Sequence, residues 1–242
     1  MSSRPRTIRY GDDPSQFGEL SLPSGTPKGL VIVIHGGFWR ARYDLSLGRP
    51  LAASLVEHGW VAWNVEYRRV GNGGGSPETM DDVGAAIDAL ADQDVPVDRV
   101  LAVGHSAGGH LAAWAASRGR QDRWSAKVEL TGVVSQAGVL DLRSAYDERL
   151  GDGAVAEFLG HAPGPHDDPV DPARQIPLDV PVHCVHSRAD DTVPVSQSCA
   201  YVAAATAAGA RAELTEVDGD HFVVIEPATD AWRLTLEILE SL

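Results

Sequence analysis

Cysteine is scarce in this chain. The 242 residues include two cysteines, Cys184 and Cys199, which are too few for the disulfide framework of a small secreted domain. They do not form the CxxC pairs that bind structural zinc, so a cysteine-ligated zinc site is disfavoured. Cys184 lies in a predicted core strand and Cys199 in a predicted helix, and we expect both to be small, buried side chains.

Long apolar runs are also lacking. No run in the sequence approaches the length of about 20 residues that a membrane-spanning helix needs. Residues 1–6 carry no apolar segment of the kind that a secretory signal contains. We therefore expect a cytoplasmic protein without a membrane partner.

Positive charge is in deficit. The chain has 20 Lys and Arg residues against 34 Asp and Glu residues, which gives a net charge of -14 and a pI near 4.9. Such a surface repels phosphate backbones, so a nucleic-acid partner is not expected. The glycine run at residues 73–75 is not followed by the GK[ST] of a phosphate-binding loop.

Metal-site spacing is not visible either. No three or four candidate ligands recur in the patterns that metal sites use, and we expect neither a metal nor a cofactor. His161 and His166 are expected to be solvated, and Asp167 and Asp168 are expected to form a surface charge pair. His183 and His186 belong to a predicted strand and are expected in the core or just behind the site.

What the chain does have is an alternation of apolar, β-rich segments with helical patterns. The run at residues 30–34 is apolar throughout, as in a central parallel strand covered on both faces. The alternation predicts one α/β domain, residues 1–242, with a doubly wound, mostly parallel sheet of about eight strands flanked by helices. Residues 143–179 break the alternation and are predicted to form a short lid insertion.

One short motif organises the site. Residues 104–108 read G-x-S-x-G around Ser106, with an apolar strand pattern before them and a helical pattern after them. This is the strand-turn-helix context of a nucleophile elbow, in which a tight turn holds the serine hydroxyl above the sheet. Ser106 is therefore the predicted nucleophile. His105 and His110 flank it but do not occupy the position expected of the base.

A serine hydroxyl needs a general base, and the base needs an orienting carboxylate. His221 and Asp190 both follow predicted strands, and the order Ser, Asp, His is the order expected for an α/β-hydrolase arrangement. Parallel strands present their carboxyl ends at one edge of the sheet, so the three residues are predicted to meet there. Asp191 and Asp141 remain alternatives to Asp190 as the acid.

The negative charge that develops on a substrate carbonyl needs two backbone N–H donors. Ala107, directly after the nucleophile, is one predicted donor. The turn at residues 35–38 is predicted to supply the other, from Gly37 or from Phe38. His35 is expected to hold this turn rather than to act as an acid or base.

With these residues in view, the chain resembles the α/β-hydrolase superfamily, and within it the kynurenine formamidase (arylformamidase) and small-esterase group. The resemblance rests on four segments: HGGxW at 35–39, GHSAGGHL at 104–111, Tyr10-Gly11 followed by Gln16, and Glu66-Tyr67-Arg68. It implies a triad of Ser106, Asp190 and His221 without a cofactor. It also implies hydrolysis of an N-formyl amide on an aromatic amine or of short acyl esters.

The expected substrate is therefore a small ester or amide. Four aromatic residues are predicted to form the pocket walls, namely Trp39, Tyr67, Phe158 and Phe222. Two other functions stay open: a general carboxylesterase without formamidase activity, and a ligand-binding module that does not turn over. The sequence leaves the oligomeric state open, a homodimer included.

Overall fold

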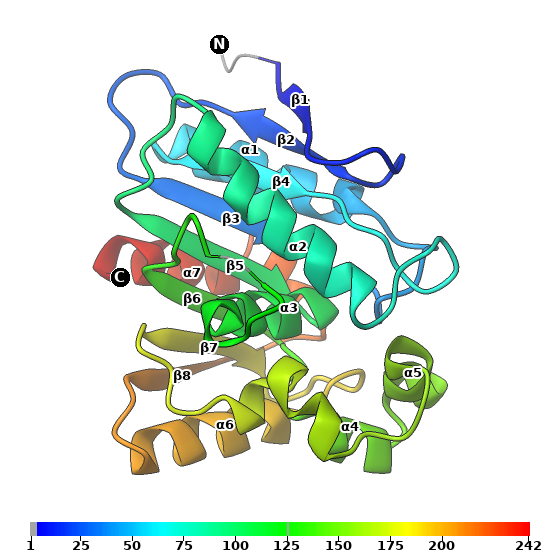
Figure 1. Cartoon of the computed structure of the whole chain (residues 1–242). Helices are drawn as coiled ribbons and strands as arrows, with labels where there is room; N and C mark the ends of the chain where they lie inside the picture. Colours follow the sequence, from blue (N-terminus) through cyan, green and yellow to red (C-terminus); the bar gives the residue numbers. More distant parts are fainter. Residues whose placement is uncertain (1–3, 125) are drawn as a thin grey trace.

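A computed structural model describes residues 4–124 and 126–242. Within them, a central sheet is flanked by helices (Figure 1). The sheet has eight strands in the order β1-β2-β4-β3-β5-β6-β7-β8. The strands are β1 (Arg6–Arg9), β2 (Phe17–Ser21), β3 (Leu30–Ile34), β4 (Val61–Val65), β5 (Val100–His105), β6 (Gly132–Gln136), β7 (Val182–Ser187) and β8 (Ala212–Val217).

The α-helices are α1 (Arg49–Glu57), α2 (Glu78–Asp88), α3 (Ala107–Ala115), α4 (Leu142–Asp147), α5 (Leu150–Leu159), α6 (Ser196–Ala207) and α7 (Asp230–Ser241). Short 3-10 helices join them, namely η1 (Leu45–Gly48), η2 (Ala89–Asp92), η3 (Arg118–Arg120), η4 (Pro165–Val170), η5 (Pro172–Arg174) and η6 (Val223–Ile225). No helix of the described residues is long and apolar enough to cross a bilayer.

The sheet is mostly parallel, as the sequence predicts. β1 pairs with β2 and β2 with β4 in antiparallel fashion, whereas every pair from β4 to β8 is parallel. Strand β3 lies between β4 and β5. The next strand in sequence, β4, is added on one side of β3, and β5 is added on the other, so the strand order reverses at β3. Ligands bind at such a reversal, outside the carboxyl ends of the strands. The turn after β3 and the turn after β5 meet at this point.

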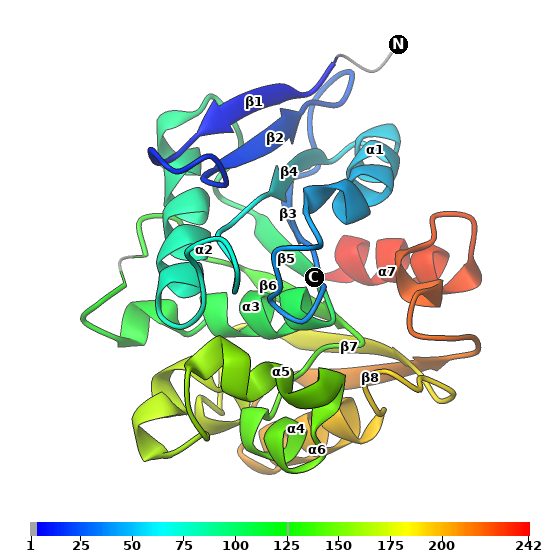
Figure 2. The same cartoon turned by 90° about the vertical axis from the view of Figure 1, so that its right-hand side faces the viewer.

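Both faces of the sheet are covered, which explains why β3 is apolar at every position. Its residues Leu30, Ile32 and Ile34 belong to a core shared with α2, α3 and α6. The alternate residues Val31 and Val33 pack against α1 and α7. In Figure 2, α1 and α7 lie on one side of the sheet and α2 and α3 on the other.

The insertion between β6 and β7 contains α4, α5, η4 and η5, so it is more regular than the predicted lid. Helix α5 packs against the turn after β3. Arg40 pairs with Glu157 at 2.7 Å, and the Trp39 ring stacks on the Phe158 ring with a centroid distance of 4.6 Å. A side chain in place of Gly151 would meet the Phe38 ring at 2.6 Å. The insertion therefore packs against this turn and supports it.

The two cysteines differ in burial. Cys184 is buried in β7, as predicted, but Cys199 is exposed on α6. The prediction for Cys199 is wrong because α6 turns polar residues inward. Gln197 is buried, and its side-chain oxygen accepts N–H groups from Leu140 and Asp141, both at 2.9 Å.

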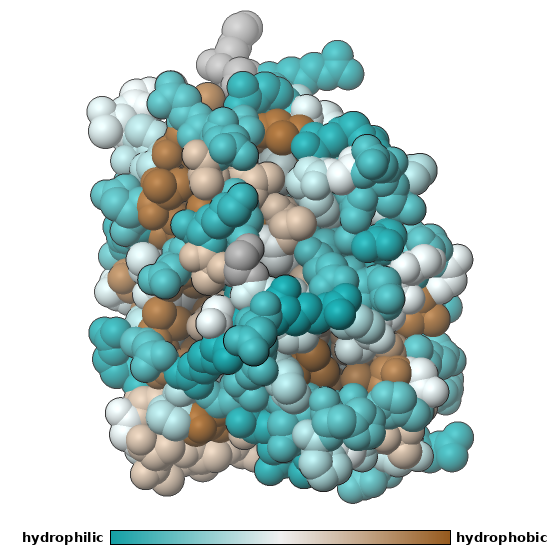
Figure 3. Space-filling model, in the orientation of Figure 1, coloured by the Kyte–Doolittle hydropathy of each residue, from teal (hydrophilic) through white to brown (hydrophobic). Residues whose placement is uncertain are grey.

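The surface of the molecule is mostly hydrophilic on the face that Figure 1 presents. In the face shown in Figure 3, hydrophilic side chains predominate, and the apolar residues gather in small, separate patches. Scattered apolar residues of this kind are normal on the surface of a folded domain.

Candidate active site

Ser106 stands between β5 and α3 in a strained conformation. Its backbone angles are φ 56° and ψ -118°, and its N–H donates to the Gln136 carbonyl at 2.8 Å. A Cβ added at Gly104 would lie 2.0 Å from the Gly108 oxygen, and one at Gly108 would lie 2.1 Å from the Ile34 oxygen. Only glycine fits at both positions, and this close packing holds the serine in its strained turn.

Asp190 and His221 come from the loops after β7 and β8. Asp190 Oδ2 lies 2.6 Å from His221 Nδ1, and both side chains are almost fully buried. The other carboxylate oxygen of Asp190 accepts the N–H groups of Thr192 at 2.9 Å and Val193 at 2.8 Å. His186 approaches Oδ2 from the far side, with its Nε2 at 3.3 Å. His186 therefore lies directly behind the acid.

These contacts set the charge of Asp190. Burial alone would raise the pKa of this carboxyl, because water is withdrawn from its charged form. Hydrogen bonds from His186, His221 and the Val193 N–H outweigh burial and hold the pKa of Asp190 well below its ordinary range. Asp190 is therefore an anion at neutral pH.

The two alternative acids are engaged elsewhere. Asp191 is exposed and accepts the Thr192 hydroxyl at 3.2 Å. Asp141 caps the start of α4 by accepting the Ser144 N–H at 2.9 Å, and it pairs with Arg174 at 2.9 Å. Asp190 is thus the carboxylate that the structure brings to His221.

The histidines on either side of Ser106 are packed into the structure. Burial lowers the pKa of His105 to about 3, and its Nε2 lies 3.0 Å from the His221 carbonyl oxygen. Because this neutral ring donates there, it anchors the backbone of His221. Burial lowers the pKa of His110 to about 4, and its Nε2 donates to the Val170 carbonyl at 2.8 Å.

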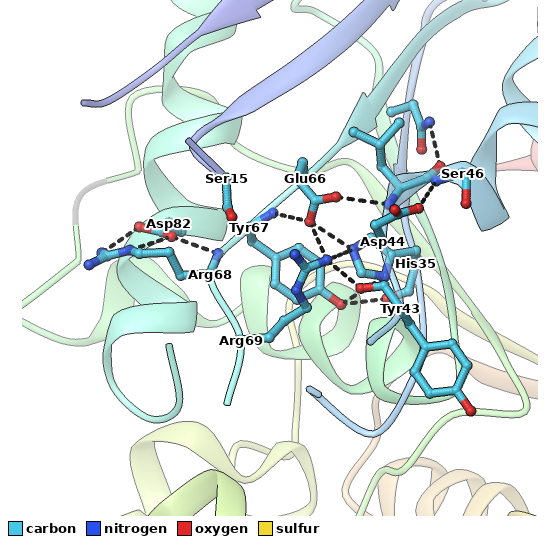
Figure 4. A network of polar contacts seen from close by, with 12 residues as sticks. Ser15, His35, Tyr43, Asp44, Ser46, Glu66, Tyr67, Arg68, Arg69 and Asp82 are labelled. Carbon is cyan, nitrogen blue, oxygen red and sulfur yellow. Dashed lines mark hydrogen bonds and ion pairs between the residues drawn. The ribbon is translucent and has the colours of Figure 1, made fainter. Parts of the chain in front are cut away.

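The turn after β3 has an unusual backbone. Gly37, Phe38 and Trp39 have φ angles of 113°, 52° and 55°. Positive φ is uncommon for residues with a side chain, and it persists only where surrounding contacts enforce it. Figure 4 shows the polar network that lies against this turn.

Glu66 is the centre of that network. One carboxylate oxygen pairs with Arg69 at 2.5 Å, lies 3.2 Å from His35 Nε2 and accepts the Tyr67 N–H at 2.9 Å. The other oxygen accepts the Leu45 N–H at 3.0 Å. Glu66 therefore contacts the loop on both sides of the Gly37-Phe38 turn, at His35 before it and at Leu45 after it.

Two further contacts complete the clamp (Figure 4). Arg69 donates to the Tyr43 carbonyl at 2.5 Å, and the Tyr67 hydroxyl donates to the His35 carbonyl at 2.6 Å. The Tyr67 and His35 rings stack with a centroid distance of 4.4 Å. His35 thus holds the loop, as expected, while its partners come from the segment directly after β4.

A cavity of about 250 Å³ opens beside the serine. Ser106 and His221 both line this cavity, together with Gly37 and Phe38 of the predicted oxyanion turn. The lining residues are Gly37, Phe38, Tyr43, Leu47, His105, Ser106, Thr192, His221 and Phe222. A second, open groove of about 650 Å³ shares Leu47 and Phe222 with this cavity.

The predicted pocket walls need correction. Phe222 lines the cavity and is 52% exposed, but Trp39, Tyr67 and Phe158 are buried in the core instead. Trp39 stacks on Phe158, and Tyr67 stacks on His35, so these rings support the turn and do not face substrate.

Three other residues form the cavity wall, and the sequence does not predict them. Tyr43, Leu47 and Thr192 line the cavity, and no residue of the insertion at 143–179 does. Their signal in the sequence is only positional, since they follow the Gly37-Phe38 turn and Asp190. The insertion acts on the cavity through Phe38 and does not cover it as a lid.

Comparison with known proteins places this arrangement in a family. The model of the BD-FAE family matches residues 20–204. The chain belongs to the BD-FAE family. The matched region runs from β2 to α6 and includes the Gly37-Phe38 turn, Ser106 and Asp190, while His221 lies beyond it.

Curated relatives are named for hydrolysis. Esterase LipC of Mycobacterium tuberculosis is 30% identical over 151 residues, which make up 59% of this chain and 37% of LipC. Kynurenine formamidase of Danio rerio is 28% identical over 138 residues, 56% of this chain and 46% of that protein. The chain thus matches less than half the length of either relative.

Solved structures confirm the predicted α/β-hydrolase fold. Esterase Est2 of Thermogutta terrifontis superposes with a TM-score of 0.77 at 22% identity, and the match covers 98% of this chain and 90% of that one. This likeness confirms the fold, and the family match and the curated relatives support the predicted α/β-hydrolase esterase group.

Proposed function

We propose that the chain is a serine hydrolase that cleaves small carboxylic esters through an acyl-enzyme. The observation that carries the proposal is the shared cavity of Ser106 and His221, with the far nitrogen of His221 bonded to Asp190. A base whose Nδ1 is occupied by a carboxylate has only Nε2 left to take a proton from the serine. A serine at a strained elbow beside such a base is the arrangement that nucleophilic catalysis needs.

The reaction follows from these groups. Ser106 Oγ attacks the ester carbonyl carbon while His221 Nε2 takes the hydroxyl proton. The Ala107 N–H and an N–H of the Gly37-Phe38 turn stabilise the oxyanion. His221 then gives the proton to the leaving alcohol, and water, activated by His221, hydrolyses the acyl-enzyme. Asp190 holds the imidazole in one tautomer and stabilises its charged form.

The cavity size favours a short acyl group. At about 250 Å³ it is smaller than the 300–1,000 Å³ typical of sites for drug-sized ligands. The adjoining groove along Leu47 and Phe222 offers room for the other half of the substrate. We infer a small acyl group in the cavity and a larger leaving group in the groove.

Arylformamide hydrolysis is the second candidate. A formyl group is the smallest acyl group, and the rings of Phe38, Tyr43 and Phe222 line the cavity where an aromatic amine would bind. The similarity to a kynurenine formamidase supports the same substrate class.

For either substrate, we propose that residues 1–242 form one catalytic domain. Its side chains and backbone N–H groups perform every step without a cofactor.

The first experiment tests for a reactive serine. We expect a fluorophosphonate probe to label the native protein and the exposed control Ser24→Ala equally, and to leave Ser106→Ala unlabelled. Absence of labelling in the native protein would favour a binding module that does not turn over.

The second experiment separates the substrates. Turnover of p-nitrophenyl acetate, butyrate and octanoate is measured beside turnover of N-formylkynurenine, in the native protein and in Ser106→Ala. We expect activity to fall from acetate to octanoate. Strong ester turnover without deformylation would leave a general carboxylesterase and reject the arylformamidase.

A further inference from the structure

Three potential metal ligands meet in the insertion between β6 and β7, outside the lining of the catalytic cavity. His161 follows the end of α5, and His166 and Asp167 lie in η4. The sequence predicts two solvated histidines and a surface carboxylate here. The Asp167 side chain is instead only 9% exposed and lies against both imidazoles.

The spacing of the ligand atoms is close to that of a tetrahedral site, and one ligand atom from each residue lies within 4.8 Å of the others. The Nε2 atoms of His161 and His166 are 3.4 Å apart. Asp167 Oδ2 lies 3.3 Å from His166 Nε2, and the other carboxylate oxygen, Oδ1, lies 3.7 Å from His161 Nε2. Zinc binds imidazole nitrogen and carboxylate oxygen at about 2.0–2.2 Å in tetrahedral geometry, which separates neighbouring ligand atoms by about 3.3–3.6 Å.

The surrounding hydrogen bonds orient these groups for binding. His161 Nδ1 lies 3.0 Å from the Ala162 carbonyl oxygen and donates to it, which places the proton on Nδ1 and a lone pair on Nε2. Asp167 accepts the Gly164 N–H at 2.7 Å, which fixes the plane of its carboxylate. Metal-binding histidines and carboxylates are oriented by such outer contacts.

The charge balance also points to a cation. Within residues 4–124 and 126–242, the ion-pair contacts of the buried Asp167 are the two histidines, whereas the neighbouring Asp168 pairs with Arg143. Two imidazole nitrogens and a carboxylate lie side by side, and a cation between them would satisfy all three groups together.

We propose that His161, His166 and Asp167 bind one transition-metal ion, Zn²⁺ or an ion with similar ligand preference, with water in the fourth position. Imidazole nitrogen selects such ions over Mg²⁺ and Ca²⁺, which prefer oxygen ligands. The ion joins the end of α5 to η4. It thereby stabilises the insertion that supports Phe38 and takes no part in the chemistry at Ser106.

The test uses the full chain without a polyhistidine tag, stripped of metal by a chelator. Titration calorimetry with ZnCl₂ is expected to give one saturable site, while MgCl₂ and CaCl₂ give no heat of binding. The Tm is expected to rise with the Zn²⁺ concentration, because an ion that binds the folded state stabilises it. Co²⁺ is expected to give the visible absorption bands of a tetrahedral centre.

Variants assign the site. His166→Ala and Asp167→Asn are each expected to weaken Zn²⁺ binding at least tenfold, a loss typical of disturbed metal sites. The asparagine variant still accepts the Gly164 N–H, so it separates lost ligation from lost folding. The exposed His58→Ala is the matched control and should bind as the native chain does. No saturable site, or equal binding in all three variants, would overturn the proposal.

Discussion

Replacement of Glu66 by Gln tests whether the network against the Gly37-Phe38 turn positions the oxyanion donor. Glu66 is 4% exposed, and its two oxygens receive donors from Leu45, Tyr67 and Arg69. Glu66→Gln keeps the shape of the side chain but removes its charge. It also puts an NH₂ group where one oxygen had accepted, so that a donor faces a donor.

The magnitude follows from burial. Removing one partner of a buried ion pair costs about 3–5 kcal/mol, because the other charge is left uncompensated, and Arg69 would be that charge here. For a domain of this size, each kcal/mol lowers Tm by about 2–4 °C, so we expect a fall of about 6–20 °C. Loss of one oxyanion donor lowers kcat about 10²–10³-fold, which is the upper limit for a displaced turn.

The assay combines thermal melting with kcat and KM for p-nitrophenyl acetate, measured well below Tm. The control is Glu157→Gln, whose carboxylate is 47% exposed and pairs with Arg40. Exposed pairs contribute little, so this variant should keep the native Tm. An unchanged Tm in Glu66→Gln would refute the stabilising role. A lower Tm with native kcat would refute the link between the network and the turn.

Three other predictions address single groups. Asp190→Asn should lower kcat about 10⁴-fold by allowing the wrong imidazole tautomer, whereas Asp191→Asn should be nearly native; the reverse ranking would transfer the acid role. A thiol reagent should modify the exposed Cys199 and spare Cys184, whose pKa burial raises to about 12; mass spectrometry finding one adduct on Cys184 would contradict this. Burial and the Asp141 charge raise the pKa of Asp171 to about 6 from 3.8, so the native state holds its proton more tightly than the unfolded chain between those values. The free energy of unfolding should therefore lose about 3 kcal/mol as pH rises through that window, and urea unfolding should show a flatter pH profile in Asp171→Asn than in the native chain.

Local sequence was sufficient to predict the sheet and the elbow. A parallel strand buried on both faces is apolar at every position, as β3 is, and this pattern needs no knowledge of distant residues. The Ser106 turn was also visible, because its geometry depends on the glycines beside it. Such features are encoded within about ten residues of the chain.

The cavity walls depend on distant packing, which explains why three of four were mispredicted. Trp39 and Tyr67 belong to the motif segments at 35–39 and 66–68, and both are aromatic, yet each is buried in the core. Trp39 stacks on Phe158 of the insertion, and Tyr67 on His35. Neither partner is indicated by sequence spacing. The face that each ring presents is decided by how α5 packs on the turn after β3.

The same reason applies to the polar groups near Asp190. The sequence shows two adjacent aspartates after β7, and nothing in their spacing states which one is buried. In the structure, Asp190 differs from Asp191 by four polar contacts. The Thr192 and Val193 N–H groups donate to one oxygen of Asp190, and His186 and His221 approach the other. A carboxylate with that many donors is held charged and fixed in orientation. The loop therefore selects Asp190 by backbone and imidazole donors together, and the strand that supplies His186 also carries the loop that presents Asp190.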